Sequence, residues 1–118
     1  MARKPIPITQ TKEHYEVRAR VAKAMAHPSR LLILDVLSVH EMCVGDLVKL
    51  VGAEQSTVSN HLAVLRNAGL VKSRREGTQS YYTVRVSCLN GFWSCIEGVL
   101  RENLAERRQA IGKPSRRA

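Results

Sequence analysis

The sequence is poor in aromatic residues. Of its 118 residues, only one is Phe, one is Trp and three are Tyr, so Leu, Val, Ile and Ala must supply most of the 44% that is hydrophobic. A core built from these side chains is thin, and a thin core often gains from burying an apolar face against a second copy of the chain. Length and composition predict one domain over residues 1–118, with residues 1–10 and 109–118 as disordered tails.

Cysteines are also few, and their number is odd. Cys43, Cys88 and Cys95 cannot form a disulfide framework, and an odd count is typical of free thiols in a reducing compartment. The sequence shows no signal-peptide pattern and no apolar run near the roughly 18 residues of a membrane-spanning helix. We therefore expect a cytoplasmic protein with no membrane partner.

Motifs of catalysis and cofactor binding are missing. The sequence contains no CxxC, HExxH, GxGxxG or P-loop pattern, and no paired carboxylates or Ser-His-Asp set. We therefore predict that the chain is not an enzyme and has no obligatory cofactor.

Positive charge, in contrast, is abundant. Lys and Arg number 19 against 10 Asp and Glu, which gives a formal net charge of +9. Such an excess favours a polyanionic partner, of which nucleic acid is the commonest. The alternative is a solvated basic surface that binds no partner.

Apolar spacing and chain-breaking residues predict an α+β protein with the order α-α-α-α-β-β-α. Pro28 and Gly52 separate helices, and Gly69 has the position of a left-handed helix end. A basic loop, Arg75–Gln79, joins the two strands. The predicted helices are Thr11–His27, Pro28–Val39, Val44–Leu50, Gln55–Ala68 and Leu89–Arg108, and the predicted strands are Leu70–Arg74 and Ser80–Val84.

The fourth predicted helix has one apolar stripe, and the positions that point outward are polar. Val58, Leu62 and Leu65 recur at i, i+4 and i+7 and should anchor the helix to the core, with Leu47, Val48 and Leu50 facing inward from the helix before it. Short hydroxyl and amide side chains on the outer positions suit a helix that enters the DNA major groove. The candidate DNA-contacting residues of this helix are Gln55, Ser56, Thr57, Ser59, Asn60, His61 and Arg66.

Two alternatives stay open on this helix. Ser56 and Thr57 could cap the helix, which is compatible with a phosphate contact at the same place. His61 lies next to Leu62 and could pack or hydrogen-bond locally instead of contacting a phosphate.

The predicted hairpin supplies charge directly after the polar helix. Arg74 and Arg75 precede Gly77, and Gln79 follows it, so these side chains could contact backbone phosphates or enter the minor groove. An ordinary solvated hairpin is the alternative. A short helix, a turn, a polar helix and a basic hairpin in this order predict a winged helix-turn-helix that binds double-stranded DNA.

At this point the chain resembles the ArsR/SmtB family of metal- and thiol-responsive repressors. The matching stretches are MAHPSRLLILDVL, EMCVGDL, QSTVSNHLAVLRNAGLV and SRREGTQSYYTV, which together cover roughly residues 22–84. The resemblance implies a homodimer formed by the first and last helices, and an inverted-repeat operator. It also implies repression in the free state and release when an inducer binds.

Two metal sites of that family are incomplete here. The family often has a cysteine pair as ELCVCDL, where this chain keeps Cys43 but has Gly45 in place of the second cysteine. A zinc-type site on the last helix would fall on Val86, Cys88, Val99 and Glu102, which include no histidine, so a zinc sensor is not expected.

The remaining cysteines suggest how an inducer is sensed. Similar proteins bind arsenic(III) or antimony(III) through cysteines near the start of the last helix, which implies Cys88 and Cys95, with Cys43 as the third possible thiolate. Seven residues along one helix span roughly 10 Å, so chelation of one ion would require Cys88 to lie before the helix and fold back. Thiol oxidation or reactive-sulfur sensing is a second reading, and three buried, inert cysteines are a third.

A different class of function is also open. A non-specific architectural protein would bind nucleic acid through its charge, without preferring one operator. A module that used its helix-turn-helix for protein contact would show aromatic and apolar anchors rather than the polar residues of Gln55–Asn60.

Overall fold

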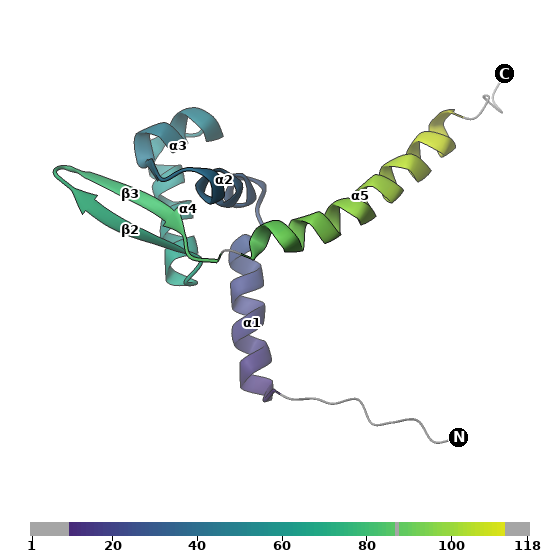
Figure 1. The fold of residues 1–118 in the computed structure, drawn as a ribbon, viewed down its shortest axis with the longest axis horizontal. Helices are drawn as coiled ribbons and strands as arrows, with labels where there is room; N and C mark the ends of the chain where they lie inside the picture. Colours follow the sequence, from purple (N-terminus) through teal and green to yellow (C-terminus); the bar gives the residue numbers. More distant parts are fainter. Residues whose placement is uncertain (1–9, 87, 113–118) are drawn as a thin grey trace. The chain divides into compact units, whose positions relative to one another are not determined.

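The computed structural model describes residues 10–86 and 88–112. Contacts divide the chain into two compact units, residues 1–85 and residues 86–118, which are described separately. The elements are α1 (Lys12–Met25), α2 (Pro28–Val39), β1 (Met42–Cys43), α3 (Val44–Val51), α4 (Gln55–Asn67), β2 (Val71–Glu76), β3 (Gln79–Val84) and α5 (Leu89–Gly112) (Figure 1). This is the predicted winged helix-turn-helix, with one short strand added.

Local signals fix the helix ends close to the predicted positions. The hydroxyl of Thr11 accepts the backbone N–H of His14 at 3.2 Å and caps α1. His27 caps α2 in the same way, because its Nδ1 accepts the N–H of Ser29 at 3.1 Å, and Pro28 follows as the first helical residue. Gly52 ends α3 with a left-handed φ of 73°, a conformation that costs glycine little.

The core of the first unit lies between α2, α3, α4 and the sheet. Its fully buried side chains are Ile33, Leu34, Leu47, Val58, Leu62, Leu65 and Val71. The predicted stripe of α4 is therefore confirmed, and so is the burial of Leu47.

The inward placement of Leu50 was wrong, because its side chain is 50% exposed. The buried and half-buried apolar positions of α3 follow the helical spacing i, i+3, i+4 and i+7, and Leu50 lies off this stripe. These positions are Val44, Leu47, Val48 and Val51.

The sheet has three antiparallel strands in the order β1-β3-β2. The sequence did not reveal β1, because two residues carry no readable period. The predicted loop Arg75–Gln79 was too long: Arg75 pairs with Ser80 and Glu76 with Gln79, so only Gly77 and Thr78 form the turn. Gly77 has a φ of 65°, as a two-residue hairpin turn requires.

The second unit is the helix α5. It continues to Gly112, so the prediction of a disordered tail from residue 109 was wrong for residues 109–112. The predicted tails over residues 1–9 and 113–118 lie outside the described residues. The prediction of a single domain over residues 1–118 stays a prediction.

Candidate nucleic-acid interface

Helix α4 divides into a buried side and an exposed side. Val58, Leu62 and Leu65 pack into the core, and the polar positions that the sequence singled out lie in solvent, with the exception of His61. The exposed candidates are Gln55, Ser56, Thr57, Ser59, Asn60 and Arg66. The folded chain thus leaves six of the seven predicted contact residues of this helix accessible.

His61 is the candidate contact residue that is not exposed, and it follows the alternative of local packing and hydrogen bonding. Its side chain is only 6% exposed, and its Nδ1 accepts a hydrogen bond from Nε of Arg30 at 3.1 Å. Its ring lies against that of His27, with centroids 4.5 Å apart. Burial lowers the pKa of His61, and the nearby His27 and Arg30 lower it further. This residue ties α4 to α2, and it cannot reach a phosphate from there.

The sequence contained a signal for this burial. Position 61 lies three residues after Val58 and next to Leu62, which places it on the apolar stripe of the helix. Arg30 also donates from Nη1 to the carbonyl oxygen of Ala24 at 3.3 Å, so one guanidinium connects the end of α1 to α4. Arg30 is 31 residues away from His61 in the chain, which is why helical spacing alone did not find it.

The first turn of α4 is open to an anion. Glu54 is the N-cap residue and makes no side-chain capping bond, so Ser56 and Thr57 are not the caps. No protein group within the described residues is bonded to either hydroxyl. Free N–H groups and the helix dipole at such an end attract phosphate.

The hairpin of β2 and β3, called the wing, lies close to this helix end. An open hollow of about 520 Å³ is lined by Gln55 of α4, by Thr78 of the hairpin turn and Gln79 of β3, and by Cys43 and Asp46 at the start of α3. Two predicted contact residues from separate elements, Gln55 and Gln79, therefore lie on one hollow. A surface that combines a helix end with a wing is what a DNA groove and its flanking phosphates require.

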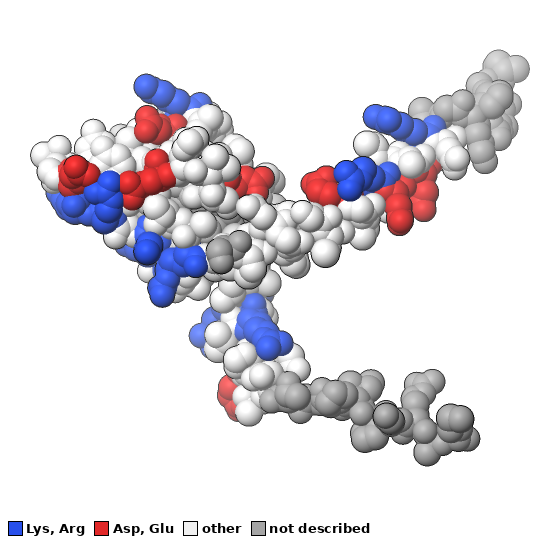
Figure 2. All heavy atoms as spheres, viewed as in Figure 1, with Lys and Arg blue, Asp and Glu red and all other residues white. Residues whose placement is uncertain are grey.

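The two arginines of the wing differ. Arg74 is held by Glu41 and Glu76, with nitrogen-to-oxygen distances of 2.6 and 2.5 Å. Arg75 is exposed and has no ion pair within the described part of the chain. Figure 2 shows acidic and basic side chains next to each other over the hairpin. Arg75 is therefore the arginine of the hairpin whose charge is not paired within the described residues.

The cysteines do not form one cluster within either unit. Cys43 is half-buried at the start of α3, where its thiol donates to Asp46 Oδ2 at 3.4 Å. Cys88 and Cys95 are exposed. The carbonyl of Cys88 accepts the N–H of Phe92 at 3.3 Å, so Cys88 already carries the first helical bond of α5. Over residues 10–86 and 88–112, no group of three or more His, Cys, Asp or Glu side chains could hold a metal ion.

None of the described helices is both long enough and apolar enough to span a membrane.

Comparisons with known proteins identify the family. Residues 27–73 match the family model described as bacterial regulatory protein, arsR family. An uncharacterized helix-turn-helix transcriptional regulator of Methanocaldococcus jannaschii is 41% identical over 73 residues, which is 61% of this chain and 82% of that protein. The regulator YgaV of Escherichia coli is 33% identical over 93 residues, which is 78% of this chain and 94% of that protein.

Solved structures agree with the sequence relatives. A homodimeric winged helix-turn-helix DNA-binding domain from Mycobacterium bovis superposes with a TM-score of 0.69 at 32% identity, over 85% of this chain and 95% of that one. NolR from Sinorhizobium fredii superposes with a TM-score of 0.68 at 36% identity, over 82% and 96%. The exposed polar helix, the basic wing and these relatives lead to one conclusion: the chain belongs to the arsR family of bacterial regulatory proteins, and it is a winged helix-turn-helix DNA-binding transcriptional regulator.

Proposed function

We propose that this regulator is a repressor that binds an inverted-repeat operator as a homodimer and leaves it when cysteine thiols react. The observation that carries the DNA-binding part is the division of α4 into a buried apolar side and an exposed side rich in hydroxyl and amide groups. Similar proteins include a biofilm growth-associated repressor of Agrobacterium fabrum, which supports repression over activation. Such a protein would act in the cytoplasm, where thiols stay reduced.

Exposed apolar residues on α1 and on α5 support the dimer. Tyr15 and Val17 of α1 are 44% and 50% exposed, and four apolar residues of α5 are about equally exposed. These four are Phe92, Val99, Leu100 and Leu104. A chain with so few aromatic residues would gain stability by covering these faces with a second copy. The Mycobacterium bovis domain is described as homodimeric, which agrees with this proposal.

Cys88 and Cys95 are the proposed sensor. Both thiols are exposed, so a small reagent can reach them without unfolding the helix. Arsenic(III) and antimony(III) are the first candidate inducers, because soft ions prefer thiolates, and Cys43 offers a third thiol. A similar protein of Staphylococcus aureus is named as a cadmium resistance regulator homologue, which also supports a soft ion.

The geometry of α5 favours a second candidate as well. Cys88 carries the first helical bond, so it does not fold back toward Cys95, and the two stay roughly 10 Å apart along the axis. One ion could then bridge them only if the first helical turn opened or another subunit supplied a thiolate. A peroxide or a polysulfide, which is itself reduced in the reaction, can oxidise two thiols of different subunits to a disulfide, and this link needs no bridge within one helix.

The test is release from DNA by defined reagents. The operator is first selected from a random DNA pool, and reduced protein on that duplex is treated separately with arsenite and with polysulfide. We expect Cys88→Ser and Cys95→Ser each to bind the operator normally and to lose release by the true inducer, a change of about 5- to 150-fold in apparent affinity. Cys43→Ser tests the third thiolate.

Specificity separates a repressor from an architectural protein. A repressor should prefer its selected site over scrambled DNA by about three or more powers of ten at moderate salt. Equal affinity for the selected and the scrambled DNA would contradict the proposal. If arsenite still released Cys88→Ser and Cys95→Ser normally, a metalloid would be excluded as the inducer acting through these thiols.

A further inference from the structure

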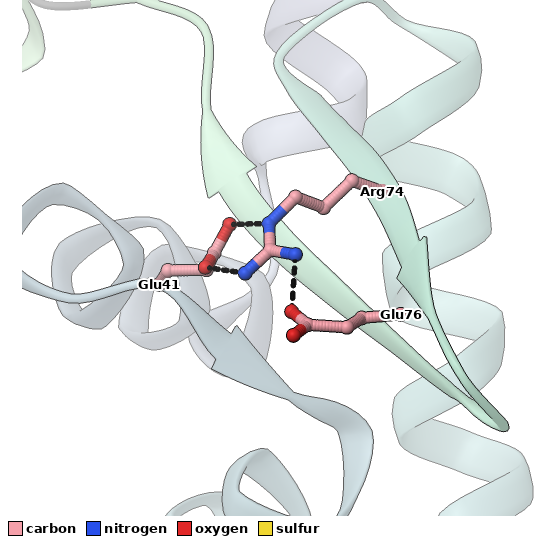
Figure 3. Close-up of polar contacts among 3 residues, drawn as sticks. All are labelled: Glu41, Arg74 and Glu76. Carbon is pink, nitrogen blue, oxygen red and sulfur yellow. Dashed lines mark hydrogen bonds and ion pairs between the residues drawn. The ribbon is translucent and has the colours of Figure 1, made fainter.

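The cluster Glu41, Arg74 and Glu76, called here the wing clamp, joins two parts of the DNA-binding unit. Arg74 lies in the middle of β2, and Glu41 lies just before β1, 33 residues earlier in the chain. The strand order β1-β3-β2 places β3 between them. The Arg74 side chain therefore crosses the central strand to reach Glu41 at the far edge of the sheet (Figure 3).

The contacts of Arg74 are specific in geometry. Its Nε donates to one oxygen of Glu41 at 2.8 Å, and its Nη2 donates to the other at 2.6 Å, which is a two-pronged pair. Its Nη1 donates to Glu76 at 2.5 Å. The guanidinium carbon lies 5.0 Å from the centre of the Tyr81 ring, which gives it a further favourable contact. The single ammonium group of a lysine could not make this two-pronged pair with Glu41.

The charge of the cluster argues against a phosphate site. One guanidinium faces two carboxylates, so the clamp as a whole carries one net negative charge. The hydrogen bond from Arg74 is the main cause that lowers the pKa of Glu41, so this carboxylate stays ionised near neutral pH. A phosphate that approached Arg74 would have to displace a paired carboxylate first.

The alternation of side chains along β2 separates Arg74 from its neighbour. Arg74, which pairs with Tyr81, shares a face of the sheet with Lys72 and Glu76. Arg75 lies on the other face, the one that buries Val71 at the base of the strand. Ser80, its cross-strand partner, lines the hollow that also contains Gln55 of α4. Arg75 therefore lies on the face of the sheet toward α4, and Arg74 lies on the opposite face.

We propose that Arg74 is a positioning residue, which with Glu41 fixes the wing relative to the helix-turn-helix, and that Arg75 makes the phosphate contact of the wing. The proposal rests on DNA binding by the surface formed by α4 and the wing. A fixed wing presents Arg75 at a set distance from α4, so less conformational freedom is lost on binding.

Removal of the Glu41 charge tests whether the clamp positions the wing or acts only through its charge. These two explanations predict opposite changes in DNA affinity. Glu41→Gln removes one negative charge and so raises the net charge of the protein by one, and electrostatics alone would therefore strengthen DNA binding. If the clamp positions the wing, the same change weakens binding by about three- to tenfold, because the wing must be ordered on the DNA. The matched control is Glu54→Gln. Glu54 is exposed beside the first turn of α4 and makes no capping bond, so removal of its charge should strengthen binding.

The dependence of affinity on salt separates the two arginines. Binding to a mixed-sequence duplex is measured between about 50 and 200 mM salt for Arg74→Gln and Arg75→Gln. We expect Arg75→Gln to reduce the salt slope by about one, the value for a single neutralised phosphate. Arg74→Gln should weaken binding without changing the slope, and Glu41→Gln combined with Arg74→Gln should be no worse than either alone.

The free protein provides a readout that does not depend on DNA. Amide hydrogen exchange in β2 and β3 should become faster in Glu41→Gln and Arg74→Gln, and not in Arg75→Gln. The proposal is overturned if Glu41→Gln binds DNA more tightly, if Arg74→Gln lowers the salt slope as Arg75→Gln does, or if exchange in the wing is unchanged. Failure of the unmodified protein to bind any duplex would instead count against the DNA-binding surface.

Discussion

Neighbouring residues with the same chemistry have different environments in this protein. Arg74 is bound by two carboxylates, and Arg75, the next residue, is exposed without an ion pair in the described chain. Asn60 lies in solvent, and His61, the next residue, is buried against His27 and Arg30. At this scale a side chain's surroundings decide its function, and residue type alone cannot distinguish a DNA contact from a structural one.

His61 should make the stability of the protein depend on pH. Because its pKa is lowered in the folded state, the unfolded chain takes up a proton first as the pH falls through the ordinary histidine value of 6.5. Stability from this group is thus full above that pH and is lost below it, at up to about 1.4 kcal/mol per pH unit. His61→Gln keeps an acceptor for Arg30 and removes the titration, so we expect a flatter curve in urea unfolding from pH 7.5 down to pH 5.5, a range of about two units.

The control for this prediction is His40→Gln, because His40 is an exposed histidine at the end of α2. It should leave the pH dependence of unfolding as in the unmodified protein. If His61→Gln and the unmodified protein lose stability in parallel on acidification, the buried histidine is not the cause.

At the scale of elements, α3 and α4 show how a sequence period becomes a binding surface. The buried residues of α4 recur at i, i+3, i+4 and i+7, so the remaining polar positions face solvent. This packing holds the polar side outward and sets the angle at which α4 is presented. The same packing predicts which leucines matter for stability.

Leu62→Ala should destabilise the protein by about 2–5 kcal/mol, because it removes a fully buried side chain and leaves a cavity between α4 and the core. Leu50→Ala is the matched control: its side chain is 50% exposed, so we expect a change within about 0.5 kcal/mol. Chemical unfolding followed by circular dichroism measures both. Equal losses in the two variants would contradict the packing of α3 and α4 described here.

At the scale of the whole molecule, charge and apolar surface have separate functions. The net charge of +9 favours binding to any nucleic acid, and in the proposed function the arrangement of α4 with the wing adds selectivity. The exposed apolar residues of α5 are a poor surface for a solvated monomer, which is the basis for the proposed dimer.

Leu104→Asp should therefore convert the dimer to monomers, because it places a charge on an apolar face that a second copy would cover. Sedimentation at micromolar concentration should show the change of mass, and affinity for an inverted repeat should fall, since a monomer contacts one half-site. Asn103→Asp adds the same charge at a polar position of α5 and should remain dimeric. A dimeric Leu104→Asp would exclude this face as the interface.

The sequence by itself determined most of the elements and the class of protein. Local signals set where helices begin and end. In this chain they are the helical spacing of apolar residues and the chain-breaking residues Pro28, Gly52 and Gly69. The order of a polar helix and a basic hairpin was enough to predict a winged helix-turn-helix. The predicted end of α5 at Arg108 was too early, since the helix continues to Gly112.

Tertiary structure alone decided which of the candidate residues are free to act. The bonds from Arg30 to His61 and from Arg74 to Glu41 join residues 31 and 33 positions apart, and no period in the chain encodes such a pair. The pairing of β1 with β3 is equally non-local, since Met42 lies opposite Tyr82. Local propensity follows from each residue and its near neighbours, whereas burial and ion pairing depend on what the folded chain brings into contact.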